Sequence, residues 1–285
     1  MNHPIAIIGC GRSGTTLLYN MLCCHPELGW FSNYTDRFPR ARPVASISLA
    51  YPMARRHGWR SRFLPLPSEG YPFWNRLCNL DGLPREDPLI ETDVTTGARA
   101  QANEVIAALL RFQRRPRFIN KNTRNTRRLR YVDALLDQPL IINVIRDPRA
   151  TVSSLLRVAF WPSISVWSQE NVRPGDWQRQ GKDPAELAAH LWADDVGRSL
   201  DDKRHLPQER YVEIRYESLV GDPAATFADI LDRTGLRMTR NVETALESFQ
   251  VRDANDKFAR HLTPAQLDLV DEVAGPLARS IGYEL

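Results

Sequence analysis

A short segment near the start of the chain most limits what the chain can fold into. Residues 5–18 read IAIIGCGRSGTTLL, an apolar run followed by a glycine-rich turn and a second apolar stretch. The run Ile5–Ile8 predicts a buried strand that ends at Gly9, and the spacing of leucines after Thr15 predicts a helix. The backbone N–H groups of such a turn face an anion at the positive end of the helix dipole. The segment therefore predicts a phosphate-binding loop.

The loop differs from the nucleoside-triphosphate motif G-x-x-x-x-G-K-[ST] at one position. Gly9 and Gly14 match the two glycines, but Thr15 stands where that motif has its lysine. Since that lysine contacts the β- and γ-phosphates, its replacement argues against a triphosphate ligand. The cation of this loop is Arg12. The candidate phosphate ligands are Gly11, Arg12, Ser13, Gly14, Thr15 and Thr16.

Apolar runs alternate with helical patterns along the rest of the chain. The expected strands are Ile5–Gly9, Pro88–Glu91, Phe118–Asn120, Leu140–Ile145 and Tyr211–Arg215. Three Asp-Pro pairs, which begin at Asp147, Asp183 and Asp222, predict helix starts. This alternation predicts an α/β fold with a central parallel sheet of about five strands.

Size and composition favour one soluble domain that spans residues 1–285, with irregular insertions at about 30–88 and 158–182. The net charge of +4 suits a small anionic ligand and is too weak to indicate nucleic acid. Four cysteines without a metal or disulfide spacing predict a reduced, cytoplasmic protein. The six histidines lack metal-site spacing, and no apolar run is long enough for a membrane span.

The motif GRSGTT, followed by two leucines and by His25-Pro26, resembles the 5′-phosphosulfate loop of sulfotransferases. It is most similar to the branch that holds tyrosylprotein sulfotransferases and many bacterial enzymes. The resemblance implies a P-loop NTPase-like three-layer sandwich with helices on both faces of the sheet. It also implies 3′-phosphoadenosine 5′-phosphosulfate (PAPS) as donor, the bisphosphate PAP as product, and no metal.

A second segment, LIINVIRDPRATVSSLL, resembles the family's 3′-phosphate site. The family has an arginine at this strand end and a serine eight positions later, which match Arg146 and Ser154. In YVEIRYESLVGDP, Tyr216 matches a tyrosine that contacts the nucleotide. In VRDANDKFARHLT, Lys257 is the expected cation for the 3′-phosphate. Arg252 and Arg260 are the alternatives there.

The resemblance also suggests catalytic groups. Lys121 follows a predicted strand and matches a lysine that supports the leaving oxygen, although the family's N-K-D-P context here reads N-K-N-T. Arg12 is the second cation. The family's glutamate base aligns with Asn33, which cannot accept a proton at neutral pH. Asp36 is the expected substitute, with Asp93 and His57 as alternatives.

The expected reaction is sulfuryl transfer to a hydroxyl or amine of a small-molecule or carbohydrate-containing acceptor. Tryptophans in the two irregular insertions favour a sugar, and the arginines of residues 111–130 are expected to be mostly solvated surface, with a subset available to an anionic acceptor. Two alternatives stay open. A P-loop small-molecule kinase would need the missing lysine, and a non-catalytic nucleotide-binding relative would account for Asn33. The sequence does not indicate the oligomeric state.

Overall fold

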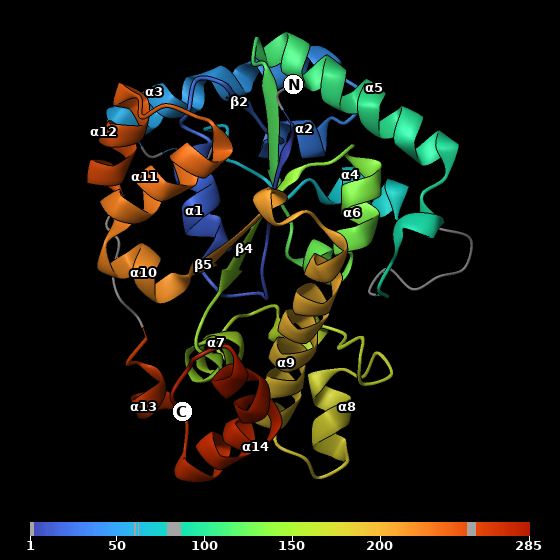
Figure 1. Cartoon of the computed structure of the whole chain (residues 1–285), viewed down its shortest axis with the longest axis vertical. Coiled ribbons are helices and arrows are strands. Elements are labelled where there is room, and N and C mark those ends of the chain that lie inside the picture. The colour runs from blue at the N-terminus through green and yellow to red at the C-terminus, as the bar shows by residue number, and fades with distance from the viewer. Residues whose placement is uncertain (1–2, 60, 62, 79–86, 250–254) are drawn as a thin grey trace.

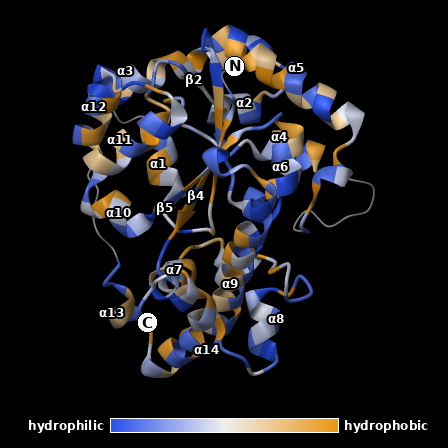
Figure 2. Ribbon diagram, viewed as in Figure 1, coloured by the Kyte–Doolittle hydropathy of each residue, from blue (hydrophilic) through white to orange (hydrophobic). Residues whose placement is uncertain are grey.

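The computed structural model describes residues 3–59, 61, 63–78, 87–249 and 255–285. Its centre is a sheet of five parallel strands in the order β2-β3-β1-β4-β5. The strands are β1 (Ile5–Ile8), β2 (Leu28–Gly29), β3 (Arg117–Lys121), β4 (Leu140–Ile145) and β5 (Tyr211–Arg215). Figure 2 shows the apolar character of the central strands, which is typical of a parallel sheet covered on both faces.

The side chains of β1 alternate between two apolar layers, as expected for a buried strand. Ile5 and Ile7 pack on one face with α1, α11 and α12, and Ala6 and Ile8 pack on the other with α4, α5 and α6. Figure 1 shows these two sets of helices on opposite sides of the sheet. The helices are α1 (Thr15–Leu22), α4 (Tyr71–Leu77), α5 (Thr96–Gln113), α6 (Leu129–Leu135), α11 (Pro223–Thr234) and α12 (Arg240–Ser248). The predicted three-layer α/β fold is therefore confirmed.

A third apolar cluster lies beyond the carboxyl ends of the strands, in the lower half of Figure 1. It is built by α7 (Pro148–Leu155), α8 (Pro174–Arg179), α9 (Pro184–Asp202) and α14 (Pro264–Ser280). The indole of Trp192 in α9 donates to the carbonyl of Arg146 at 2.9 Å, which ties this cluster to the end of β4. Ten further short helices complete the described chain: α2 (Asn33–Arg37), α3 (Tyr51–Arg56), α10 (Tyr216–Gly221), α13 (Phe258–His261) and 3₁₀ turns at 42–50, 91–93, 123–127, 161–163, 203–205 and 208–210.

One predicted strand is wrong, and one real strand was missed. Residues 88–90 form no strand; Leu89 packs beside α6, and the Ile90 N–H donates to the Asp93 carboxylate at 2.8 Å to start a 3₁₀ turn. The outer position in the sheet belongs to β2, whose two residues are too few to produce an alternating pattern. The helix starts at Asp147, Asp183 and Asp222 are confirmed, because each side chain accepts a backbone N–H of its helix.

No helix among the residues described here has the length and apolar character needed to cross a membrane.

Candidate active site

The carboxyl ends of the central strands open into one cavity of about 1220 Å³. In parallel sheets, ligands bind at this edge because the loops that follow the strands converge there. The loop after β1, Lys121 of β3, Arg146 after β4 and Tyr216 after β5 all line the cavity. Segments that lie far apart in sequence thus meet at one place.

The loop after β1 has a backbone that demands glycine at two positions. Gly9 has φ +145°, and a Cβ there would lie 2.4 Å from the carbonyl oxygen of Val144. Gly14 has φ +91°, and a Cβ there would lie 2.4 Å from the ring of Tyr216. Gly14 begins α1 with no side-chain cap among the described residues, so the first turn of α1 presents its N–H groups towards the cavity. This geometry suits an anion.

The hydroxyl groups of the loop have different surroundings. Thr15 and Thr16 line the cavity, together with Gly11 and Arg12. Ser13 is fully buried, and both its hydroxyl and its N–H donate to the carbonyl of Cys10, at 2.7 and 3.2 Å. Ser13 therefore stabilises the turn through hydrogen bonds inside the loop.

Arg146 lies next to this loop, at the end of β4. Its Nη1 donates to the carbonyl oxygen of Arg12 at 3.1 Å, and its guanidinium stacks 4.1 Å from the ring centroid of Tyr216. Its Nε donates to Asn255 Oδ1 at 2.9 Å. Burial lowers the pKa of Arg146, while Tyr216 and Glu217 act in the opposite direction. The two predicted oxyanion sites are therefore neighbours on the same side of the molecule.

Glu217 and Asn255 were missed in the sequence, yet they hold Arg146 in place. Glu217 Oε1 accepts from the Asn255 amide and from the Asp147 N–H, both at 3.1 Å. Glu217 Oε2 accepts from the hydroxyl of Tyr283 at 3.0 Å. Their only sequence signal is proximity to Tyr216 and Lys257.

The remaining predicted 3′-phosphate ligands stand around Arg146. Ser154 in α7 accepts from Arg12 Nε at 3.0 Å, and its neighbour Ser153 lies 3.3 Å from His261 Nδ1. Both serines and Lys257 line the cavity. Arg260 is exposed and does not line it, and Arg252 lies outside the described residues.

Lys121 is buried at the end of β3 and pairs with a residue that the sequence reasoning missed. Its Nζ lies 2.5 Å from Glu69 Oε1, and both side chains line the cavity. Glu69 follows a run without any acid between residues 37 and 68, the one signal that could have drawn attention to it. A carboxylate and an ammonium are thus placed together beside the loop.

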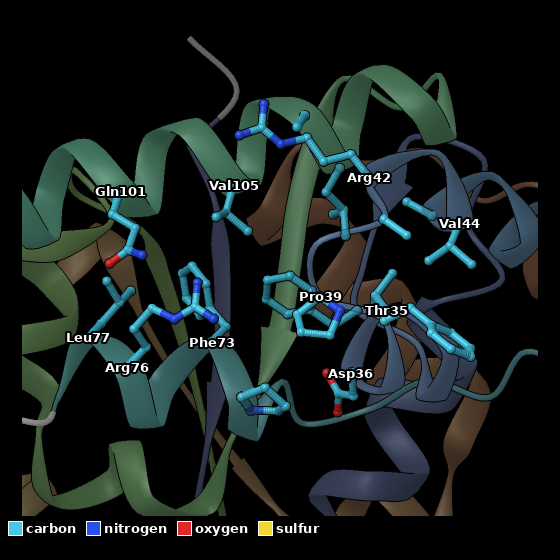
Figure 3. Close-up of a pocket in the computed structure, with 17 residues that line it drawn as sticks. Thr35, Asp36, Pro39, Arg42, Val44, Phe73, Arg76, Leu77, Gln101 and Val105 are labelled. Atoms are coloured by element: carbon cyan, nitrogen blue, oxygen red, sulfur yellow. The ribbon is translucent and has the colours of Figure 1, made fainter.

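Asp36, the expected base, lies elsewhere. It lines a smaller, mostly apolar pocket of about 70 Å³ between α2 and α5. Figure 3 shows its carboxylate beside Thr35 and Pro39 at one side of that pocket. Its Oδ2 accepts from the hydroxyl of Ser68, and burial raises the pKa of Asp36. Asp36 does not line the large cavity.

The other sequence candidates for the base also have structural partners. Asn33 donates to the carbonyl of Leu64 at 3.2 Å and accepts from the N–H of Leu66 at 2.9 Å, so it fixes the segment that precedes Glu69. Asp93 caps the turn after residue 90. His57 is exposed and stacks on Trp59.

The cavity is strongly cationic. Among the described residues that line it, eight are cations and two are carboxylates, so it favours a ligand with several negative charges. The cations are Arg12, Lys121, Arg124, Arg127, Arg146, Arg157, Arg173 and Lys257. The carboxylates are Glu69 and Asp195, and Asp195 lies 3.4 Å from Arg127 Nε.

Arginines 111–130 are less solvated than the sequence suggested. Arg117, Arg127 and Arg128 are buried. Arg117 donates to the carbonyls of His3 and Thr234, and Arg128 to that of Asp87. Much of this segment therefore joins elements of the fold, and Arg124 and Arg127 face the cavity.

The fold and the cavity define an α/β enzyme that holds a polyanionic nucleotide on a glycine-rich loop and a neighbouring strand end. Residues 4–240 match the model of the Sulfotransferase family. The chain belongs to this family. The predicted enzyme class is thereby confirmed, and with it the PAPS donor at the level of the family.

Individual relatives agree with this assignment. The chain is 24% identical to the omega-hydroxy-beta-dihydromenaquinone-9 sulfotransferase Stf3 of Mycobacterium bovis, over 99% of this chain and 75% of that protein. Sulfotransferase STF9 from Mycobacterium avium has a similar structure, with a TM-score of 0.66 and 15% identity, over 100% of this chain and 78% of that one. The sulfotransferase domain of the Synechococcus PCC 7002 olefin synthase gives a TM-score of 0.54 and 21% identity, over 100% and 97% of the two chains.

Proposed function

We propose that this sulfotransferase binds PAPS across the large cavity, with the 5′-phosphosulfate at the loop after β1 and the 3′-phosphate at Arg146. The observation that carries the proposal is the direct contact between these two sites, in which Arg146 bonds to Arg12 and Arg12 bonds to Ser154. Lys257 lines the same cavity and supplies a further positive charge. One nucleotide with phosphates on both its 3′ and 5′ oxygens fits two adjoining cationic sites.

Tyr216 belongs to the nucleotide site in this proposal. Its ring lies against Gly14 and against the guanidinium of Arg146, so it packs between the two phosphate sites. The aromatic face supports Arg146 and offers an apolar surface to the nucleoside.

The cations at the sulfuryl group supply the stabilisation that the reaction needs. An acceptor oxygen attacks sulfur while the bond from sulfur to the bridging oxygen breaks and PAP leaves. Negative charge grows on the bridging oxygen, and a cation placed there lowers the barrier. We assign this role to Lys121, helped by Arg12 and the N–H groups of the first turn of α1.

The acceptor that we propose is an alcohol carried on an apolar small molecule. The expectation of a sugar was based on tryptophans, but no tryptophan lines the described cavity, and Trp30, Trp74, Trp161 and Trp177 are buried. The apolar lining instead consists of Leu17, Leu155, Val158, Phe160, Ile164 and Leu191, with Tyr71 beside Glu69. The printed name of the mycobacterial relative, a hydroxylated menaquinone sulfotransferase, supports an apolar alcohol.

Calorimetry with PAP, ADP and ATP tests the donor site. The purified protein is expected to bind PAP about a hundredfold more tightly than ADP, because two or more charge-assisted hydrogen bonds to the 3′-phosphate are each worth roughly 1.5–3 kcal/mol. Preference for ATP would instead support the kinase alternative. Transfer of labelled sulfate to a panel of apolar alcohols and glycans then tests the acceptor class, and products from glycans alone would contradict it.

The cytoplasm is the proposed location. All four cysteines are buried free thiols, which supports a reducing compartment.

A further inference from the structure

Glu69 occupies an unusual position in the cavity, because it meets Lys121 through its side chain and the flanking asparagines through its backbone. Its Oε1 lies 2.5 Å from Lys121 Nζ, while its carbonyl accepts from Asn120 Nδ2 at 3.3 Å and from Asn122 Nδ2 at 3.2 Å. Its Oε2 accepts from the hydroxyl of Tyr71 at 3.0 Å. Three consecutive residues at the end of β3 therefore hold one acid at the reaction site.

Contacts of the two residues that flank Glu69 also fix the conformation of this turn. Gly70 has φ +69°, and a Cβ there would lie 2.6 Å from the ring of Phe31. Ser68 donates to the Asp36 carboxylate and accepts from the N–H of Gly70 at 3.2 Å. Asp36 thus acts as a positioning residue for this turn.

No other described acid that lines the cavity is placed for proton transfer beside Lys121. Asp195 is buried, lies 3.4 Å from Arg127 Nε and accepts from the indole of Trp167 at 3.0 Å. His261 lies at the opposite, Arg146 end, within hydrogen-bonding distance of Arg157 and Ser153. Glu69 retains 27% of its side-chain exposure, so an acceptor can reach it.

We propose that Glu69 is the general base of the reaction. We further propose that Lys121 exchanges partners: it pairs with Glu69 when no donor is bound and with the sulfuryl donor when PAPS is bound. This inference rests on the proposed function. Without donor, Lys121 neutralises Glu69. When PAPS binds, its sulfuryl and bridging oxygens draw Lys121 away, and the carboxylate becomes available to the acceptor. The base is thus active only in a site that holds donor.

The step balances as follows. Glu69 takes the proton of the acceptor O–H as the acceptor oxygen forms a bond to sulfur. The bond between sulfur and the bridging oxygen breaks, and its electron pair stays on the 5′-phosphate of PAP, where Lys121 stabilises it. The proton on Glu69 then passes to water. The products are the sulfate ester, PAP and one proton.

Nucleotide binding tests the exchange without any acceptor. Glu69→Gln is expected to raise the affinity for PAPS about two- to fivefold, because a partly exposed ion pair no longer competes for Lys121. Lys121→Met is expected to lower that affinity about tenfold or more, since it removes a charge-assisted contact. In the Lys121→Met background, Glu69→Gln is expected to have no effect. An affinity unchanged by Glu69→Gln, or a gain that persists without Lys121, would overturn the exchange.

Turnover tests the base. The acceptor is 1-octanol; if the wild-type protein forms no octyl sulfate, hydrolysis of PAPS by water is measured instead. In either assay, Glu69→Gln is expected to lower the transfer rate about 10²- to 10⁴-fold. Added formate is expected to restore part of the rate in Glu69→Ala, which a purely structural role would not allow. The control Glu91→Gln, which changes an acid paired with Arg130 away from the cavity, is expected to keep the wild-type rate.

The outcomes separate the two proposals. If wild-type protein prefers PAP over ADP while Glu69→Gln keeps the wild-type transfer rate, the donor site stands and the base is wrong. If Asp36→Asn loses the rate and Glu69→Gln does not, Asp36 is the base. If wild-type protein does not prefer PAP, the proposed function itself fails.

Discussion

Arg146 is the residue at which three distant segments of the chain converge. It contacts the carbonyl of Arg12 from the first loop, the ring of Tyr216 after β5 and the amide of Asn255 near the C-terminus. Its orientation is therefore set before any nucleotide arrives. A side chain held in this way loses little conformational entropy on binding a phosphate.

Replacing Arg146 by alanine should weaken PAP binding about a hundredfold and ADP binding far less, because the lost hydrogen bonds go to the 3′-phosphate. Calorimetry with both nucleotides measures the difference. Arg233→Ala, which removes an exposed arginine paired with Asp229 on α11, is the matched control and should change neither affinity. Equal losses for PAP and ADP would show that the 3′-phosphate lies elsewhere.

Asp36 should make stability depend on pH in a particular direction. Burial raises its pKa in the folded protein above the ordinary value of 3.8, so the folded state holds the proton more tightly than the unfolded state. Its contribution to stability is then present at low pH and is lost as the pH rises through the raised pKa. Asp36→Asn should remove this decline. Urea unfolding from about pH 4 to about pH 7 measures it, and an unchanged slope in the variant would contradict the prediction.

At the scale of elements, the helix that follows β4 carries the 3′-phosphate site. α7 begins after Asp147, whose side chain accepts from the N–H of Arg149 at 2.8 Å, and its second-last residue, Ser154, lines the cavity. The Asp147 N–H in turn donates to Glu217. The start of this helix is therefore coupled to the residues around Arg146.

Asp147→Ala should cost about 1 kcal/mol of unfolding free energy through loss of the N-cap, and should also weaken PAP binding. Asp222→Ala offers a matched comparison, because Asp222 caps α11 by accepting from Ala225 at 3.0 Å and does not line the cavity. It should cost similar stability and leave PAP affinity unchanged. Chemical denaturation and calorimetry measure the two effects. A loss of affinity in both variants would point to general destabilisation instead.

The strands show which parts of the fold and of the site could be predicted from the sequence. Four strands could be predicted because three contain a short apolar run and β5 alternates apolar and polar residues, and parallel strands present their carboxyl ends at one edge. That rule placed Arg12, Lys121 and Arg146 together. β2 could not be predicted, since two residues carry no pattern. Glu69 could be singled out only as the first acid after residue 36; its place at the site depends on a turn at Gly70 and on contacts with β3, which the sequence does not indicate.

At the scale of the whole molecule, helix α9 of the lower cluster forms hydrogen bonds with β4 and with the residue that follows it. The Asn143 amide in β4 donates to Ser199 in α9 at 3.1 Å, and Trp192 of the same helix donates to the carbonyl of Arg146. These buried bonds join the lower cluster to the sheet from the middle of α9 and from near its C-terminal end. They support our proposal that the chain forms a single domain.

Thermal or urea unfolding should accordingly give one transition, with coincident far- and near-ultraviolet circular dichroism. PAP at about a hundredfold its Kd should raise the unfolding free energy by roughly 2.7 kcal/mol without splitting the transition. Two separated transitions, of which PAP shifts only one, would indicate independent units.

Glu69 lies on the irregular connection between α3 and α4, whereas Arg12 and Arg146 directly follow strands. The strand ends thus hold the nucleotide, which every reaction of this kind shares, and an irregular connection faces the acceptor, which can differ. Grafting residues 63–77 from a relative with a different preference should therefore redirect which alcohol is esterified while the nucleotide requirement persists. Such modularity would let one framework diversify its chemistry by changing a single connection.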